Sequence, residues 1–131
     1  MQSYLGATFC LQPPGDTATR KGIFDSLMVG CIPVIFDEQQ LEFQYELHIP
    51  SPEAISVLIS KEHQDNIFEY LESIPTERVR ALRDAISKMG HSLQYAKEQP
   101  LNADPDALDV AISHLLDLEE SGSYMNCVRS M

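Results

Sequence analysis

Two basic residues, Arg20 and Lys21, stand where a helix is expected to begin, within the stretch CLQPPGDTATRKGIFDSLMVGCIPVIF at residues 10–36. A helix N-terminus carries positive partial charge and unpaired N–H groups, so cations there are unfavourable unless an anion lies beside them. The hydroxyls of Thr17 and Thr19, the first-turn N–H groups and Arg20 could converge on a phosphate or diphosphate. The spacing therefore allows an anion-binding site, with a solvated helix start as the alternative.

Asp25 follows Lys21 by four residues, which places both side chains on the same flank of the expected helix. As an exposed ion pair they would contribute only a few tenths of a kcal/mol to stability. Beside a bound anion, the carboxylate of Asp25 would suit hydrogen bonding to sugar hydroxyls. Spacing alone leaves both interpretations open.

The patterns of several other catalytic sites are missing. The segment GDTATRKG does not match the P-loop pattern GxxxxGK[ST], and neither GxGxxG nor the GxSxG elbow occurs. Asp37 and Glu38, after the second apolar run, are either a solvated pair or acids at a sheet edge. The four histidines lack HExxH spacing and are interpreted as ordinary surface or core residues: His48, His63, His91 and His114.

The cysteines form an odd set without a CxxC pair: Cys10, Cys31 and Cys127. This spacing does not predict a metal cluster. Because Cys10 and Cys31 adjoin apolar runs, we expect buried thiols there, and the disulfide state of all three cysteines stays open.

The charge balance narrows the classes of partner. The net charge of −11 argues against nucleic acid and anionic lipid, which need a basic surface. Residues 1–36 are balanced, with Arg20 and Lys21 against Asp16 and Asp25, so residues 37–131 carry the whole excess. An anionic ligand would therefore bind most readily to the opening third.

The elements that must position these residues form a βαβ unit. Residues 8–12 are strand-like, residues 13–19 form a loop containing Pro13-Pro14-Gly15, and residues 20–29 form a helix that Gly30 would end. The loop's Asp16, Thr17 and Thr19 are all able to cap that helix. The apolar run 31–36 predicts a buried parallel strand. The loop after the first strand then lies at the carboxyl edge of the sheet, where ligands bind in open α/β folds.

The remaining elements are mainly helical. Residues 55–60 predict a strand and residues 66–74 a short helix ended by Pro75. Thr76 would cap a longer amphipathic helix reaching residue 96 across Gly90. Asp104 would cap a last helix whose apolar face is expected to comprise Leu108, Ala111, Ile112, Leu115 and Leu118. We expect one domain over residues 1–120 and a frayed tail over 121–131.

The stretch FCLQPPGDTATRKGIFDSLMVGCIPVIF resembles the exostosin-like glycosyltransferases, glycosyltransferase family 47, and is closest to their plant-type xyloglucan galactosyltransferase branch. The resemblance is carried by Phe9 to Asp16, Thr17, Thr19-Arg20-Lys21, Phe24-Asp25-Ser26 and Gly30 to Val34. It is specific over these residues and weakens after residue 36.

The resemblance implies an α/β chain: the Rossmann-like C-terminal, donor-binding half of a GT-B glycosyltransferase, with a partial parallel sheet, flanking helices and a helical C-terminus. It implies transfer of galactose or a related sugar from a UDP-sugar to a glycan or polysaccharide, with inversion and without a metal or cofactor. It also implies a Golgi membrane protein with a lumenal domain. By this likeness Arg20, with Lys21, would hold the diphosphate, Thr17 and Thr19 would line the phosphate pocket, and Asp25 would bind the ribose or donor sugar.

The sequence departs from the family pattern at Gly22, where many exostosins carry the key arginine three residues before the acid. Arg20 lies five before it. The acceptor site, the catalytic base and the membrane anchor are expected outside this sequence, so the isolated chain should bind donor weakly or not at all and should not catalyse transfer. A non-catalytic remnant that acts as a binding or interaction module is the alternative function.

Overall fold

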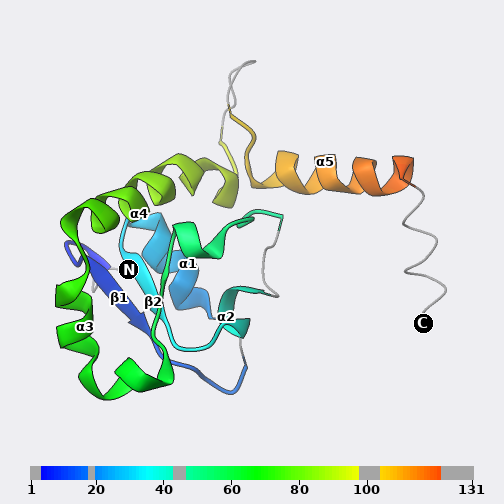
Figure 1. The fold of residues 1–131 in the computed structure, drawn as a ribbon. Helices are drawn as coiled ribbons and strands as arrows, with labels where there is room; N and C mark the ends of the chain where they lie inside the picture. Colours follow the sequence, from blue (N-terminus) through cyan, green and yellow to red (C-terminus); the bar gives the residue numbers. More distant parts are fainter. Residues whose placement is uncertain (1–3, 18–19, 43–46, 98–103, 122–131) are drawn as a thin grey trace. The chain divides into compact units, whose positions relative to one another are not determined.

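The computed structural model describes residues 4–17, 20–42, 47–97 and 104–121 (Figure 1). The chain falls into two compact units, residues 1–90 and residues 91–131, and each is described by itself. The expected division at residue 120 stays a prediction, and nearly all of the expected tail lies outside the described residues.

Unit 1 is built on a parallel sheet with strand order β1-β2-β3. The strands are β1 (Phe9–Gln12), β2 (Ile32–Ile35) and β3 (Val57–Leu58). In the β1–β2 register Phe9 pairs with Ile32 and Gln12 with Ile35. All four residues of β2 are buried, as expected for a central parallel strand. The prediction of a mixed α/β chain with a parallel sheet is thus confirmed, although β3 is shorter than residues 55–60.

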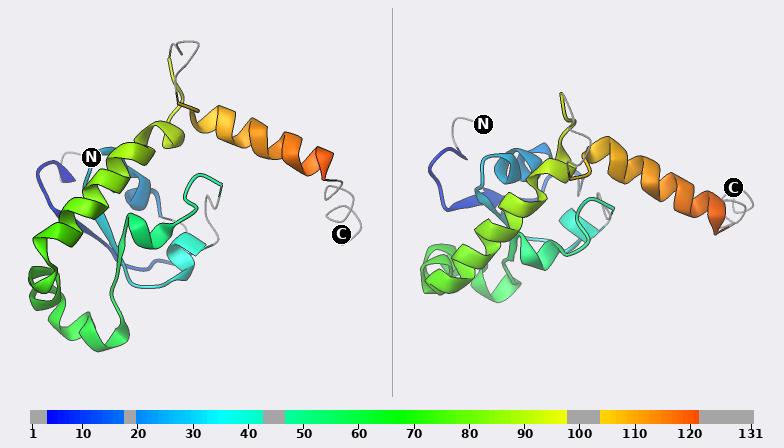
Figure 2. Two further views of the ribbon diagram at one scale, coloured as in Figure 1. Left: turned by 45° about the horizontal axis from the view of Figure 1, so that its top comes forward. Right: turned by 90° about the horizontal axis from the view of Figure 1, so that it is seen from above.

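Helix α1 (Lys21–Met28) connects β1 to β2 and packs against both strands through buried Ile23 and Leu27 (Figure 1, Figure 2). It ends as predicted, because Gly30 adopts a left-handed φ of +72°. The Gly30 N–H donates to the Leu27 carbonyl at 3.1 Å, and the Cys31 N–H donates to the Ser26 carbonyl at 2.9 Å. This pair of bonds is the Schellman motif, which turns the chain directly into β2.

Short helices and one long helix follow β2: α2 (Gln39–Glu42), η2 (Pro52–Ala54), η3 (Lys61–Asn66), α3 (Ile67–Ser73) and α4 (Thr76–Met89). The predicted cap at Thr76 is wrong, because Pro75 occupies the N-cap and Thr76 is already helical. The predicted continuation past Gly90 is also wrong as an α-helix, since η4 (Gly90–Leu93) is a 3₁₀ turn. Helix α4 packs against β2 and buries Leu82 and Ile86.

Unit 2 contains helix α5 (Ala107–Glu120). The predicted cap at Asp104 is wrong, since Asp106 is the N-cap and forms a capping box with Asp109. The backbone N–H groups of Ala96, Asp109 and Leu108 hold the pKa of Asp106 below 3.8. Of the expected apolar face, Leu108, Ile112 and Leu115 are exposed, as is Leu116.

No helix within the described ranges combines the length and the apolar character needed to cross a membrane.

Candidate functional site

Arg20 occupies the N-cap of α1, with extended backbone angles of φ −137° and ψ 114°. The helix therefore begins one residue later than expected. The guanidinium of Arg20 lies against Gly15 in the loop after β1, where an added Cβ would be 2.7 Å from Nη2. The Nε atom of Arg20 is buried and has no hydrogen-bond partner among the described residues. A cation with an unused donor thus stands between the end of β1 and the start of α1.

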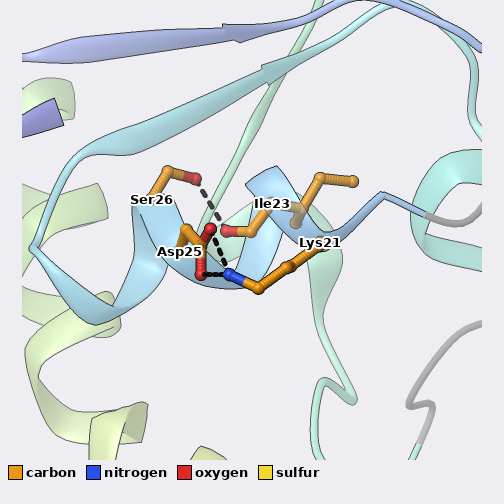
Figure 3. A network of polar contacts seen from close by, with 4 residues as sticks. All are labelled: Lys21, Ile23, Asp25 and Ser26. Carbon is orange, nitrogen blue, oxygen red and sulfur yellow. Dashed lines mark hydrogen bonds and ion pairs between the residues drawn. The ribbon is translucent and has the colours of Figure 1, made fainter. Parts of the chain in front are cut away.

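Lys21 and Asp25 form the expected ion pair (Figure 3). The Lys21 Nζ atom lies 2.5 Å from Oδ1 and 2.6 Å from Oδ2 of Asp25. The Lys21 side chain is 83% exposed and that of Asp25 20% exposed. This ion pair confirms the prediction that the four-residue spacing places Lys21 and Asp25 side by side. The role of Asp25 in sugar binding stays a prediction.

Ser26, next to Asp25, faces the opposite way. Its buried hydroxyl donates to the carbonyl of Ile23 at 2.7 Å (Figure 3). The bond satisfies the hydroxyl inside the core, so Ser26 anchors the helix and leaves the acid beside it outward.

The loop residues Asp16 and Thr17 are exposed, and neither occupies the N-cap. The N-cap expectation is therefore wrong for both. Thr19 lies outside the described residues. Phosphate binding by Thr17 and Thr19 stays a prediction, as do the ligand roles of Arg20 and Lys21.

Two glutamines, Gln12 at the end of β1 and Gln40 in α2, were missed by the sequence reasoning. Gln40 is 1% exposed, and its Oε1 accepts from the N–H groups of Phe36 and Asp37 while its Nε2 donates to the Gln12 carbonyl. This amide ties the end of β1 to the end of β2. Gln12, the last residue of β1, is 3% exposed, and its Nε2 has no hydrogen-bond partner among the described residues. The only available signal for Gln12 was a polar residue at the end of an apolar run; Gln40 lies four residues beyond the run 31–36, and no local pattern marks it.

Cys10 and Cys31 form a disulfide, with 6.0 Å between their Cα atoms. The expectation of two buried thiols is wrong, although both cysteines are indeed buried. Parallel pairing places β1 beside β2, and Cys31 directly precedes β2, so the sulfur atoms meet. The bond closes the loop that carries the anion-site residues. Cys127 lies outside the described residues.

A cavity of about 520 Å³ lies at the ends of β2 and β3, apart from the predicted site residues. Ile35, Leu58 and Tyr70 contribute to its walls. The lining also includes Glu38 and Arg78, and Arg78 is held by donating to the Glu53 carbonyl at 2.6 Å. No pattern in the sequence predicts this cavity, because its walls come from five separate elements.

Asp37 and Glu38 have separate surroundings. The Asp37 carboxylate accepts from the Gln39 N–H at 3.0 Å, whereas Glu38 lines the cavity. Across the described ranges, no group of three or more His, Cys, Asp or Glu side chains is placed to hold a metal ion. Metal-independent transfer stays a prediction.

Comparison with known proteins covers most of the chain. Residues 1–74 match the exostosin GT47 domain. A probable xyloglucan galactosyltransferase, GT19, from Arabidopsis thaliana is 37% identical over 126 residues, which span 89% of this chain and 29% of that protein. The xyloglucan galactosyltransferase XLT2 of the same plant is 39% identical over 86% of this chain and 23% of its own length. A xyloglucan-specific galacturonosyltransferase from it is 41% identical over 71% of this chain and 14% of its own length.

This chain thus spans less than a third of the length of each of these relatives. The domain match covers more than half of the chain and includes the whole segment from β1 through α1 to β2. The chain belongs to the exostosin GT47 family.

Proposed function

We propose that this chain is the donor-binding part of a GT-B glycosyltransferase that transfers galactose or a related sugar from a UDP-sugar to a xyloglucan-like polysaccharide, with inversion and without a cofactor. The observation that carries the proposal is Arg20 near the carboxyl end of β1, whose buried Nε has no partner within the described ranges. In open α/β sheets this edge is where ligands bind. A diphosphate supplies the acceptor oxygens and negative charge that this position lacks.

The names of the relatives support the proposed class of reaction, glycosyl transfer. Several are named as xyloglucan galactosyltransferases and one as a xyloglucan-specific galacturonosyltransferase. Their differing names leave a choice between related hexosyl donors, whereas xyloglucan is common to them. The Cys10–Cys31 disulfide agrees with an oxidising compartment, which supports placement of this domain in the Golgi lumen.

In the proposed reaction an acceptor hydroxyl attacks the anomeric carbon from the side opposite the diphosphate. The bond between that carbon and the diphosphate oxygen breaks, UDP leaves with the electron pair, and a base in the N-terminal domain takes the hydroxyl proton. Arg20, Lys21 and the first-turn N–H groups of α1 stabilise the negative charge that develops on the leaving group. Asp25 exchanges its contact with Lys21 for a ribose or sugar hydroxyl.

Donor binding is tested by following backbone amide resonances of the chain by NMR during titration with UDP and UDP-galactose. Arg20→Ala is expected to weaken UDP binding at least about tenfold, the effect of losing one charge-assisted hydrogen bond. Arg80→Ala is the matched control, because Arg80 is an exposed arginine of α4. Unchanged UDP affinity in Arg20→Ala, or no response of the wild-type chain at the highest soluble UDP concentration, would refute the proposed site.

Transfer is tested with radiolabelled UDP-galactose and xyloglucan oligosaccharides, using this chain and, in parallel, the longest product of its gene. The proposal expects label in the acceptor only with the longer product, because the base and acceptor site are assigned to the other domain. If neither product transfers label, the non-catalytic remnant is the better account. Transfer by these 131 residues alone would refute the division of labour between the two domains.

A further inference from the structure

The side chain of Gln12 carries a buried donor that no residue in the described part of the chain accepts from. Gln12 is 3% exposed, and its Nε2 atom has no hydrogen-bond partner among the described residues. Buried amide groups are nearly always paired, because an unmade bond leaves the full desolvation cost uncompensated. An unpaired donor at the end of a strand therefore needs an explanation.

The amide of Gln12 lies directly against the first turn of α1. A Cβ added at Gly22 would be 2.4 Å from Gln12 Oε1 and 3.3 Å from its Cδ. The Tyr4 hydroxyl would be 3.2 Å from the same point. Glycine at position 22 thus makes room for the amide beneath the helix start, and a larger residue there would displace it.

The backbone of Gln12 is held in place independently of its side chain. Its carbonyl accepts from Gln40 Nε2 at 3.0 Å, and Gln40 in turn binds the backbone at the end of β2. The strand end is therefore fixed, and the side chain is not needed to complete the link between β1 and β2. No described residue accepts a hydrogen bond from the amide nitrogen, so a purely structural role does not explain it.

Other donors at the start of α1 are unused as well. Besides Gln12 Nε2, the Arg20 Nε atom is buried without a partner among the described residues, and the N–H groups of Lys21 and Gly22 have no acceptor within the helix, whereas the Ile23 N–H donates to the Arg20 carbonyl. A ligand that satisfies all of them must present several acceptor oxygens and negative charge, as a diphosphate does.

We infer that Gln12 is a further ligand-binding residue, whose Nε2 donates a hydrogen bond to a diphosphate oxygen of the bound nucleotide. This inference rests on the proposed function. Because Nε2 is closed to solvent without ligand, the contact forms with a local shift of the atoms around it. A neutral amide adds a donor without adding a charge, so it complements Arg20.

The test follows the Gln12 side-chain NH₂ resonances by NMR, assigned by their loss in Gln12→Leu. The probes are UDP, inorganic pyrophosphate and, as a phosphate-free control, uridine. The Gln12 pair is expected to shift with UDP and pyrophosphate along the same binding curve as the backbone amides of Lys21 and Gly22, and not with uridine. This measurement on the wild-type chain stays decisive if a variant fails to fold.

The variants give a second readout. Gln12→Glu keeps the shape, removes the donor and adds a negative charge, so it is expected to weaken UDP binding at least about tenfold and more than Gln12→Leu does. Gln64→Leu, at an exposed glutamine of η3, should leave the UDP affinity unchanged. If the α1 amides shift with UDP while the Gln12 pair does not, the inference is wrong and the proposed donor site stands. If no resonance of the site shifts, both are wrong.

Discussion

Gly22→Ala tests the packing of Gln12 beneath α1. Gly22 is the second residue of the helix, and its added Cβ would stand 2.4 Å from Gln12 Oε1, inside any allowed contact distance. Alanine gains at most about 1 kcal/mol of helix propensity over glycine. Overpacking a filled interior costs about 1–3 kcal/mol. The net expectation is a loss of between zero and about 3 kcal/mol in the free energy of unfolding.

The sign of this effect should depend on Gln12. In a Gln12→Ala background the amide is gone, and the remaining tight contact is with the Tyr4 hydroxyl at 3.2 Å. Gly22→Ala is then expected to be neutral or stabilising, by up to about 1 kcal/mol. The coupling energy between the two positions should equal the overpacking cost, about 1–3 kcal/mol.

Urea denaturation of the four chains measures this coupling, provided that the m-value stays constant. Gly90→Ala is the control, because an added Cβ there meets no atom within 4 Å. It should change stability equally in both backgrounds. If Gly22→Ala costs the same with and without the Gln12 amide, then the amide does not pack beneath the helix start, and the geometric basis of the Gln12 inference fails.

Three further predictions concern other features. The Cys10–Cys31 disulfide joins residues 21 apart, so its reduction should lower the free energy of unfolding by about 3 kcal/mol. In calorimetry this corresponds to a melting temperature lower by roughly 12–24 °C, and equal melting temperatures of the oxidised and reduced chains would contradict the prediction. Gly15→Ala should displace the Arg20 guanidinium and weaken UDP binding in titrations while leaving thermal stability unchanged, because the new Cβ meets only the end of a flexible side chain. The lowered pKa of Asp106 means that its stabilising contribution is present above the ordinary pKa of an aspartate and is lost as the pH falls through the lower folded value. Asp106→Asn should therefore flatten the acid loss of helical circular dichroism, and an unaltered pH profile would count against it.

Local signals in the sequence were enough to predict the β1–α1–β2 unit. Strand β1 is followed at once by the breaker Pro13-Pro14-Gly15, and β2 is one continuous apolar run. Gly30 marks the end of the helix, since only glycine adopts its φ of +72° without strain. These features depend on neighbouring residues, so the parallel arrangement and the carboxyl-edge position of the basic residues followed from them.

Helix starts were predicted less well, because residue type alone does not choose between nearby caps. Asp104 and Asp106 are equally good N-cap residues by type. Asp106 also accepts from the Ala96 N–H at 2.8 Å, a contact ten residues away along the chain. Packing of the preceding segment therefore decided where α5 begins.

The sequence by itself determined the family, the parallel βαβ unit and the placement of Arg20, Lys21 and Asp25 around one helix start. Only the tertiary structure decided which polar atoms at that helix start form hydrogen bonds or ion pairs and which have no partner among the described residues. The Cys10–Cys31 bond, the Gln40 link and the burial of the Gln12 amide all depend on the register between strands 20 or more residues apart. That register is a property of the packed sheet, so no pattern within a short window could have revealed the unpaired donor beneath α1.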